Sequence, residues 1–141
     1  MTVLKHLRRD ERGAAIIEMA IAMPTLLLFL YGIFQVGVAF QAKAGMQHAL
    51  GEGARYATLC YNPTIANGCT VPTNDQIKTR INERVFGTKV GTYSDPVVTN
   101  GPANSGYRTL SVTFTMTPNY LFFNGPPVNI TETKRVYIAG T

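Results

Sequence analysis

Hydrophobic residues form one nearly continuous stretch near the start of the chain, over residues 14–40. The stretch is interrupted mainly by Glu18, Pro24, Thr25 and Gln35. As an α-helix, its 27 residues would rise about 40 Å, more than the roughly 30 Å of a bilayer's hydrocarbon core. The pattern therefore predicts a transmembrane helix over residues 14–40. We expect a kink at Pro24, because proline lacks the N–H of an intrahelical hydrogen bond.

The helical pattern continues beyond this stretch, over residues 41–59, which contain no proline. Small residues recur there at three- and four-residue spacing and would lie along one stripe: Ala42, Gly45, Ala49, Gly53 and Ala57. Such a stripe lets another helix or a sheet approach closely. We expect residues 41–59 to be the exported part of the same helix. The alternative is that their glycines mark a loop between the anchor and a domain.

A short amphipathic helix is predicted after residue 72. Thr73 and Gln76 have the spacing of a capping box. Ile77, Ile81 and Val85 follow at four-residue intervals, which gives the helix one apolar face, and Gly87 comes where the helix should stop.

The last third of the chain has the pattern of β-strands. Residues 108–117 alternate between apolar and polar side chains, as in an antiparallel strand with one buried face. Residues 89–99 and 129–138 offer two more strands. The apolar residues 120–123 lie in a connection, where they either cap the core or form an exposed contact. We expect them to cap the core, since most large apolar residues are at least partly buried.

The charge distribution favours one membrane orientation. Residues 1–13 form a leader in which Lys5, Arg8, Arg9 and Arg12 outnumber Asp10 and Glu11, so the leader carries +2 of the chain's net charge of +5. By the positive-inside tendency, the N-terminus stays cytoplasmic and the C-terminal region is exported. The rest of the chain has no dense Lys/Arg patch with interleaved aromatic residues, so we expect no nucleic-acid partner.

A glycine and an acidic residue stand where the leader meets the apolar stretch. Gly13 precedes Ala14, and Glu18 is the fifth residue after Gly13. A carboxylate at the centre of a membrane helix costs about 2.5–3.5 kcal/mol on insertion scales, so its presence calls for a reason. A basic leader, a glycine and an acid at this spacing resemble the cleavage and assembly signature of type IV prepilins.

Two other interpretations account for part of this N-terminus. A cleaved secretory signal would use Ala42-Lys43-Ala44 as its cleavage site. The apolar region of such a signal runs for roughly 7–15 residues, however, and this one is far longer. A simple membrane anchor explains the length and the charge bias but leaves Gly13 and Glu18 unexplained.

Cys60 and Cys69 are the two cysteines of the chain and flank a turn-rich segment. In an oxidising compartment they would form a structural disulfide that closes a small loop. A zinc site would need two more ligands, for which His6 and His48 are the other candidates. A redox pair is more often spaced Cys-x-x-Cys, so we expect a structural disulfide and no metal.

Enzymatic chemistry has little support in the sequence. His48 and Glu52 stand four residues apart on the predicted helix, but they lack a third ligand or a nucleophile at matching spacing. Ser94, Ser105 and Ser111 have no catalytic motif around them, and no phosphate-binding glycine loop is present. We therefore expect a protein that is not an enzyme and needs no cofactor.

Residues 12–58 resemble TadE-like proteins, the minor pilins (pseudopilins) of tight-adherence, or type IVc, pilus systems. The similar features are the segment from Gly13 to Glu18, Pro24 with its leucine run, the segment from Gly32 to Gln35, and the segment from Glu52 to Ala57. Residues 112–118 and the terminal strand are more weakly similar. Met19 departs from the tyrosine or phenylalanine of many tight-adherence pilins. This departure and the chain's length argue against a major pilin.

The resemblance implies a pilin-like α+β fold, in which the exported half of a long helix packs against a small antiparallel sheet. Its parts would be a leader (1–13), a transmembrane helix (14–40), the exported part of that helix (41–59) and a periplasmic domain (60–141). A prepilin peptidase would cut between Gly13 and Ala14, and Glu18 would pair with the new amine of a neighbouring subunit.

By this resemblance the protein would prime, cap or support a type IVc pilus at the bacterial inner membrane or in the fibre. The implied partners are the peptidase, other pilin and minor pilin subunits, the inner-membrane assembly platform and membrane lipid. The alternative is a membrane-anchored periplasmic binding or adhesion module that enters no filament.

Overall fold

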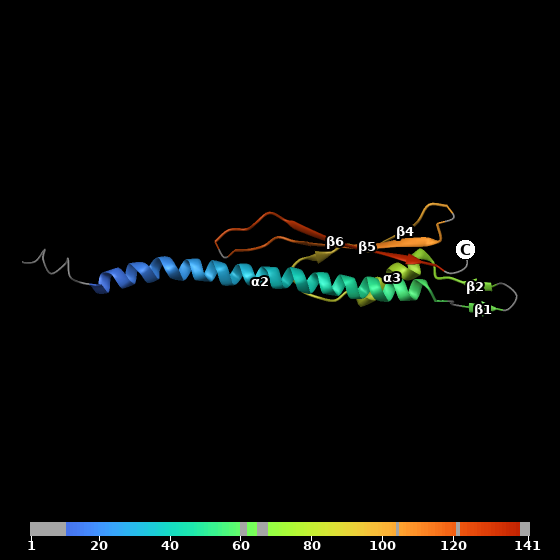
Figure 1. Ribbon diagram of the computed structural model, residues 1–141, viewed down its shortest axis with the longest axis horizontal. Helices are drawn as coiled ribbons and strands as arrows, with labels where there is room; N and C mark the ends of the chain where they lie inside the picture. Colours follow the sequence, from blue (N-terminus) through green and yellow to red (C-terminus); the bar gives the residue numbers. More distant parts are fainter. Residues whose placement is uncertain (1–10, 60–61, 65–67, 104, 121, 139–141) are drawn as a thin grey trace, which may run out of the picture.

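The computed structural model describes residues 11–59, 62–64, 68–103, 105–120 and 122–138. Within them the order of elements is α2 (Glu11–Ala57), β1 (Asn62–Thr64), β2 (Gly68–Thr70), α3 (Asn74–Arg84), β3 (Thr92–Tyr93), β4 (Val97–Asn100), β5 (Tyr107–Met116) and β6 (Val128–Tyr137). The sheet and α3 lie along one half of α2, whose N-terminal half projects beyond them (Figure 1). The predicted α+β fold class is confirmed.

The helix α2 is continuous over 47 residues, which corresponds to about 70 Å. Its first buried residue is Gln35, and buried residues then recur every three or four positions up to Ala57. They are Gln35, Val38, Ala42, Gly45, Met46, Ala49, Leu50, Gly53, Ala54 and Ala57. The predicted stripe of small residues is confirmed. The alternative of a loop between anchor and domain is wrong, because the helix extends to Ala57.

The strand β5 is the centre of a four-stranded antiparallel sheet. β6 pairs with it along its whole length, from Tyr107 opposite Tyr137 to Met116 opposite Val128. β3 and β4 share the other edge of β5. The alternation predicted for β5 is confirmed, since its buried residues are Leu110, Val112, Phe114 and Met116. These side chains belong to the core that the sheet forms with α2 and α3.

The predicted strands agree with the structure except at Pro96. The strand predicted over residues 89–99 is two short strands, β3 and β4, and Pro96 lies between them. Proline has no N–H to donate to a sheet ladder, so pairing is interrupted there. The structure also has a small antiparallel hairpin, β1–β2, inside the segment that the sequence indicates only as turn-rich.

The short helix α3 begins as its sequence predicts. The side chain of Thr73 accepts a hydrogen bond from the backbone of Gln76, and the Gln76 side chain accepts one from the backbone of Thr73. Ile77 and Ile81 are fully buried in the core. The predicted stop at Gly87 is wrong, because the helix ends at Arg84.

The expectation that residues 120–123 cap the core is wrong for the two phenylalanines. Phe122 is 66% exposed and Phe123 is 59% exposed, whereas Tyr120 is half-buried. These residues belong to the connection between β5 and β6, which extends along α2 beyond the strands of the sheet (Figure 1). The buried cluster does not include them, so nothing in the core covers the two rings.

Two glycines let the other elements approach the backbone of α2. A Cβ atom at Gly45 would overlap the backbone carbonyl of Phe86, and one at Gly53 would overlap the side chain of Ile81 on α3. A Cβ atom at Gly51 would instead meet only the Lys134 Nζ atom, at 3.8 Å. Gly45 and Gly53 are therefore required by packing, and Gly51 is not.

We predict that Gly45→Ala and Gly51→Ala change stability in opposite directions. Gly45→Ala should lower the free energy of unfolding by about 1–3 kcal/mol, the usual cost of overpacking against a fixed group. Gly51→Ala should raise it by about 0.5–1 kcal/mol, because alanine loses less conformational freedom in a helix. Denaturant unfolding of the full chain in detergent, followed by circular dichroism, measures both. Equal stabilisation by the two variants would contradict the close approach at Gly45.

Candidate functional site

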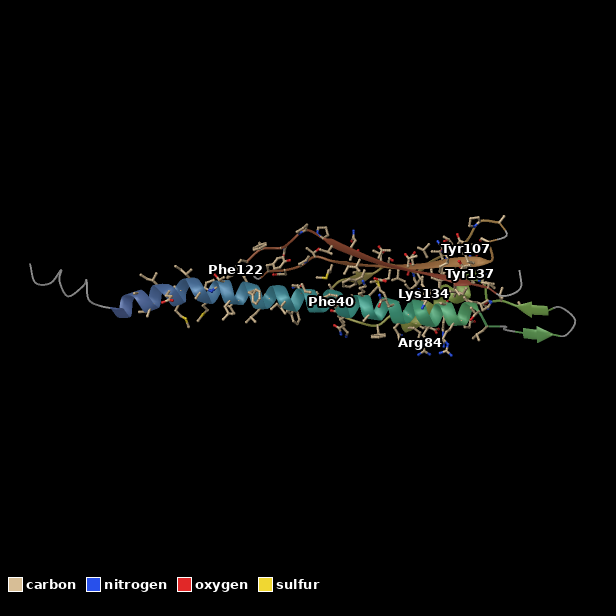
Figure 2. The ribbon with its side chains drawn as sticks, in the orientation of Figure 1. Phe40, Arg84, Tyr107, Phe122, Lys134 and Tyr137 are labelled. Carbon is tan, nitrogen blue, oxygen red and sulfur yellow. The ribbon has the colours of Figure 1, made fainter. Side chains whose placement is uncertain are left out.

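The N-terminal half of α2 presents an apolar surface that the domain leaves uncovered. None of residues 13–34 is buried, and their exposed large apolar side chains are 44–71% exposed. These side chains point outward around the helix (Figure 2). Residues 13–57 are long and apolar enough, by length and composition, to cross a membrane. The unburied residues 13–34 correspond to about 33 Å of helix, close to the thickness of a hydrocarbon core.

Gly13 and Ala14 lie in the first turn of α2. Both are exposed, and a Cβ atom at Gly13 would meet nothing within 4 Å. The first turn of a helix has backbone N–H groups without intrahelical partners, and glycine is a weak helix former. The backbone between Gly13 and Ala14 is therefore accessible and lies in the part of α2 that unwinds at the lowest cost.

Glu18 lies one turn after Ala14 on the same helix face, at the spacing i, i+4. It is exposed, and within the described part of the chain it has no ion-pair or hydrogen-bond partner. Its neighbours along the helix include the exposed side chains of Ile17, Met19 and Ile21. A carboxylate among apolar side chains is costly in lipid unless a cation neutralises it.

Pro24 does not end the helix, which continues through it. Next to it, the Thr25 hydroxyl donates a hydrogen bond to the Ile21 carbonyl at 3.0 Å. A threonine hydroxyl that is satisfied within its own helix is compatible with lipid. The predicted kink at Pro24 stays a prediction.

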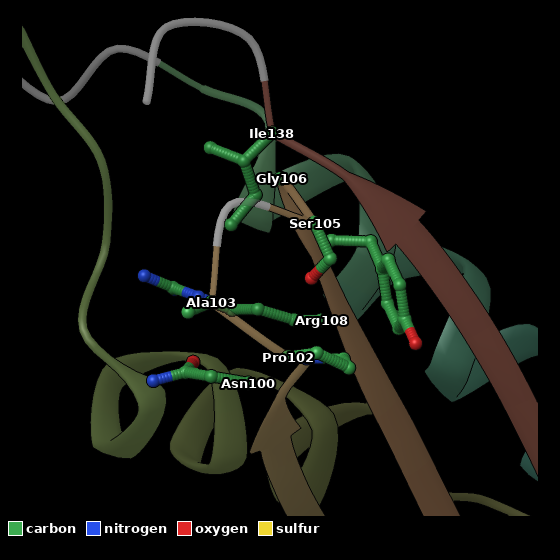
Figure 3. A pocket seen from close by; sticks show the side chains of 9 residues that line it. Asn100, Pro102, Ala103, Ser105, Gly106, Arg108 and Ile138 are labelled. Carbon is green, nitrogen blue, oxygen red and sulfur yellow. The ribbon is translucent and has the colours of Figure 1, made fainter.

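A second candidate site lies at the far end of the sheet, where the β4–β5 connection and the end of β6 surround a cavity of about 350 Å³ (Figure 3). Arg108 reaches from this cavity to donate to the Pro72 carbonyl at 2.5 Å, and burial lowers the pKa of Arg108 below its ordinary value. On the neighbouring sheet face, the Tyr107 and Tyr137 rings meet edge to face, with their ring centres 5.8 Å apart. The Cζ atom of the Arg135 guanidinium lies 4.6 Å from the centre of the Tyr107 ring.

His48 and Glu52 do not form a site together. The His48 ring packs edge-on against the Phe86 ring, with their centres 5.2 Å apart. Glu52 instead pairs with Arg55, whose guanidinium nitrogen lies 4.0 Å from the Glu52 carboxylate oxygen. Within the described ranges, no group of three or more His, Cys, Asp or Glu side chains is placed to hold a metal ion. The helix surface with Gly13, Ala14 and Glu18 is therefore the stronger candidate for function.

Comparison with known proteins matches this helix to a family. Residues 13–55 match the model of the TadE-like protein family, which confirms the resemblance over these residues. The matched segment lies wholly within α2 and includes Gly13, Glu18 and Pro24 but no part of α3 or the sheet. No curated protein and no solved structure matches the chain. The match associates the chain with Tad pili, and the long apolar helix fits a membrane anchor in such a protein.

The predicted disulfide falls partly outside the described residues. Cys60 is not among them, and of Cys69 the structure describes the backbone, in β2 opposite Pro63. The pairing of the two thiols therefore stays a prediction.

We expect Cys60 and Cys69 to be joined within one chain when the protein is purified from an oxidising compartment. Cys60→Ser should then lower the free energy of unfolding by roughly 2–4 kcal/mol, because a closed loop restricts the unfolded chain. Mass spectrometry of non-reduced peptides identifies the bond, and denaturant unfolding measures the loss. A Thr58→Ser variant on the preceding turn is the control. Two free thiols in the purified protein would refute the disulfide between Cys60 and Cys69.

Proposed function

We propose that this protein is a minor pilin, or pseudopilin, that primes, caps or supports assembly of a type IVc (Tad/Flp) pilus. The observation that carries the proposal is that the TadE-like match coincides with a helix whose residues 13–34 are unburied and, apart from Glu18, largely apolar. The helix would anchor the chain in the bacterial inner membrane, with the leader in the cytoplasm and the sheet in the periplasm. The leader's net charge of +2 favours this orientation.

The first step is removal of the leader by a prepilin peptidase, which cuts the bond between Gly13 and Ala14. The accessible position of Gly13 in the first turn of α2 supports this step, because the enzyme needs an unobstructed, locally unwound backbone. Hydrolysis leaves a carboxylate on Gly13 and a protonated α-amine on Ala14. The mature protein therefore begins with a positive charge next to an apolar helix.

The second step is pairing of that amine with Glu18 of a neighbouring subunit. Lipid tails are as apolar as leucine, so exchanging lipid for another helix brings little hydrophobic gain. A charge pair formed in low dielectric contributes chiefly geometric specificity, because a misplaced subunit leaves both charges unpaired. The pairing would therefore fix the axial position of one subunit relative to the next. Other pilin subunits and the inner-membrane assembly platform are the partners this mechanism requires.

A membrane-anchored binding or adhesion module that enters no filament is the second candidate. It is favoured by the cavity beside Arg108 and by the cluster of the half-buried Tyr107 with the exposed Arg135 and Tyr137 at the far end of the sheet. The two functions differ when the prepilin peptidase is deleted. A pilin would then remain unprocessed in cells without pili, whereas processing of an independent module would be unchanged.

We predict that the mature protein begins at Ala14. Top-down mass spectrometry of the protein from its native membrane should give the mass of residues 14–141, and Gly13→Leu should accumulate the precursor because its side chain obstructs the scissile bond. Gly37→Leu, in open space further along α2, is the matched control and should be processed normally. A native N-terminus at Met1 or Gly45 would exclude the peptidase mechanism.

We further predict that Glu18→Ala separates membrane insertion from assembly. Removing a carboxylate from an apolar helix should leave insertion and cleavage intact or improve them. Pili should nevertheless be lost, because the amine of a neighbour has no partner. Counts of pili by electron microscopy and immunoblots of the processed protein measure the two effects, with Glu52→Ala on the exported half as the control. Normal pilus numbers with Glu18→Ala would remove the assembly role from this residue.

A further inference from the structure

Two stretches of the chain without Asp, Glu, Lys or Arg run along each other for part of their length (Figure 1). One is residues 19–42 of α2, and the other is residues 109–131, which comprise most of β5, the β5–β6 connection and the start of β6. The β5–β6 hairpin follows α2 towards the N-terminal end of the helix (Figure 1). Where the domain lies nearest to the exposed N-terminal half of α2, neither of these two segments carries a charged residue.

Both uncharged stretches end at the same level of the molecule. The next charged residue on α2 is Lys43 and the next on β6 is Glu132, and these two form an ion pair with Nζ and Oε1 3.3 Å apart. Gln47 donates a second hydrogen bond, of 3.3 Å, to Glu132. From this ion pair towards the N-terminal end, neither segment carries a charge until Glu18.

The connection between β5 and β6 satisfies much of its own backbone. The backbone N–H of Tyr120 donates to the Phe123 carbonyl at 2.8 Å, and that of Gly125 donates to the Pro118 carbonyl at 2.7 Å. The Gln35 side chain, the first buried group of α2, donates to the Asn119 carbonyl at 3.1 Å and ties the connection to the helix. A loop with internally paired backbone groups enters an apolar environment at lower cost than an open one.

The same connection exposes two aromatic rings beside the free helix. Phe122 and Phe123 are 66% and 59% exposed. Phe122 lies further towards the N-terminal end of α2 than Phe40 does (Figure 2). On the helix, Leu28, Tyr31 and Gly32 are half-buried and continue the stripe of Gln35 in this direction. The two phenylalanines therefore lie alongside the segment that has the composition of a membrane span.

The length of the helix places this connection at a bilayer surface. Residues 14–34 rise about 31 Å and match a hydrocarbon core, so α2 leaves the apolar region at about Gln35. Gln35 is the residue that holds the β5–β6 connection. Aromatic side chains are favoured where the hydrocarbon meets the headgroups.

From these observations we infer that the β5–β6 connection inserts Phe122 and Phe123 into the surface of the bilayer that α2 crosses, on the periplasmic side. This inference rests on the membrane anchorage in the proposed function. The inserted loop is a second lipid contact, which fixes the depth and tilt of the domain before assembly. The inference places the exposed rings of Phe122 and Phe123 in lipid. Burial of these rings against another protein would exclude it.

The chain contains no tryptophan, so a single substitution creates a unique fluorescent probe. We would compare Phe29→Trp in the exposed helix, Phe122→Trp in the loop and Tyr137→Trp at the far end of β6, each as the full chain. Phe29, Phe122 and Tyr137 are similarly exposed, at 65, 66 and 65%, so the three probes are matched. The proteins are reconstituted in phosphatidylcholine and phosphatidylglycerol vesicles, with and without brominated acyl chains that quench tryptophan on contact.

We predict blue-shifted emission and strong quenching by brominated lipid for Phe29→Trp and Phe122→Trp, and neither effect for Tyr137→Trp. If Phe29→Trp is quenched but Phe122→Trp emits as in water and is not quenched, the loop insertion is wrong and the anchorage stands. Blue-shifted but unquenched Phe122→Trp would also overturn it, because the ring would be covered by another copy of the protein. Unquenched Phe29→Trp would refute the anchorage itself and the loop insertion with it.

A second pair of variants guards against a local effect of tryptophan at residue 122. Phe123→Trp should show the same blue shift and quenching, since both rings lie in the same turn. Phe122→Ser combined with Phe29→Trp should shift the depth profile of the Phe29 probe, obtained with bromine at different acyl positions. An unchanged depth profile would show that the loop does not set the depth of the helix and would overturn that part of the inference.

Discussion

The close approach of the domain to the small-residue stripe of α2 is the contact on which the rest of the structure depends. Gly45 allows the Phe86 carbonyl to reach the helix, and Gly53 allows Ile81 to do so. With these two contacts in place, α3 and β5 bury their apolar faces on the second half of α2. The first half is left with its apolar side chains exposed. One continuous helix therefore has two kinds of surface, one packed into the protein core from Gln35 onwards and one of exposed apolar side chains before it.

Much of this arrangement could be predicted from the sequence because its signals are local. Helical periodicity, the capping box at Thr73 and the alternation of β5 each depend on residues a few positions apart. Beyond the local errors at Gly87 and Pro96, what the sequence analysis missed depends on distant residues. The exposure of Phe122 and Phe123 could not be read from their apolarity, because burial depends on where the core ends. The pairing of Lys43 with Glu132 joins segments 89 residues apart, and no local pattern indicates it.

The candidate site was more predictable than the domain for the same reason. Gly13, Ala14 and Glu18 are defined by spacing along a single helix, and the family match covers that helix and stops before the domain. The sheet and α3 lie outside the matched residues. The proposed pilin function therefore rests on α2, and what distinguishes this protein from others with such a helix must be sought in its domain and in the β5–β6 connection.

The proposed function also explains why a costly carboxylate suits an otherwise apolar helix. An apolar side chain gains little when lipid is replaced by another helix, so apolar residues alone provide almost no preference for the filament over the membrane. In the proposed function Glu18 would change this balance, because a carboxylate that is unpaired in lipid would be paired in the filament with the amine of Ala14. A loop held in lipid by Phe122 and Phe123 acts in the opposite direction, since those rings must leave the bilayer with the subunit. Assembly would then depend on two opposing interactions at opposite ends of one membrane span: the charge pair of Glu18, which favours the filament, and the lipid contact of the two rings, which opposes it. The charge pair would have to form before the aromatic contact with lipid is lost.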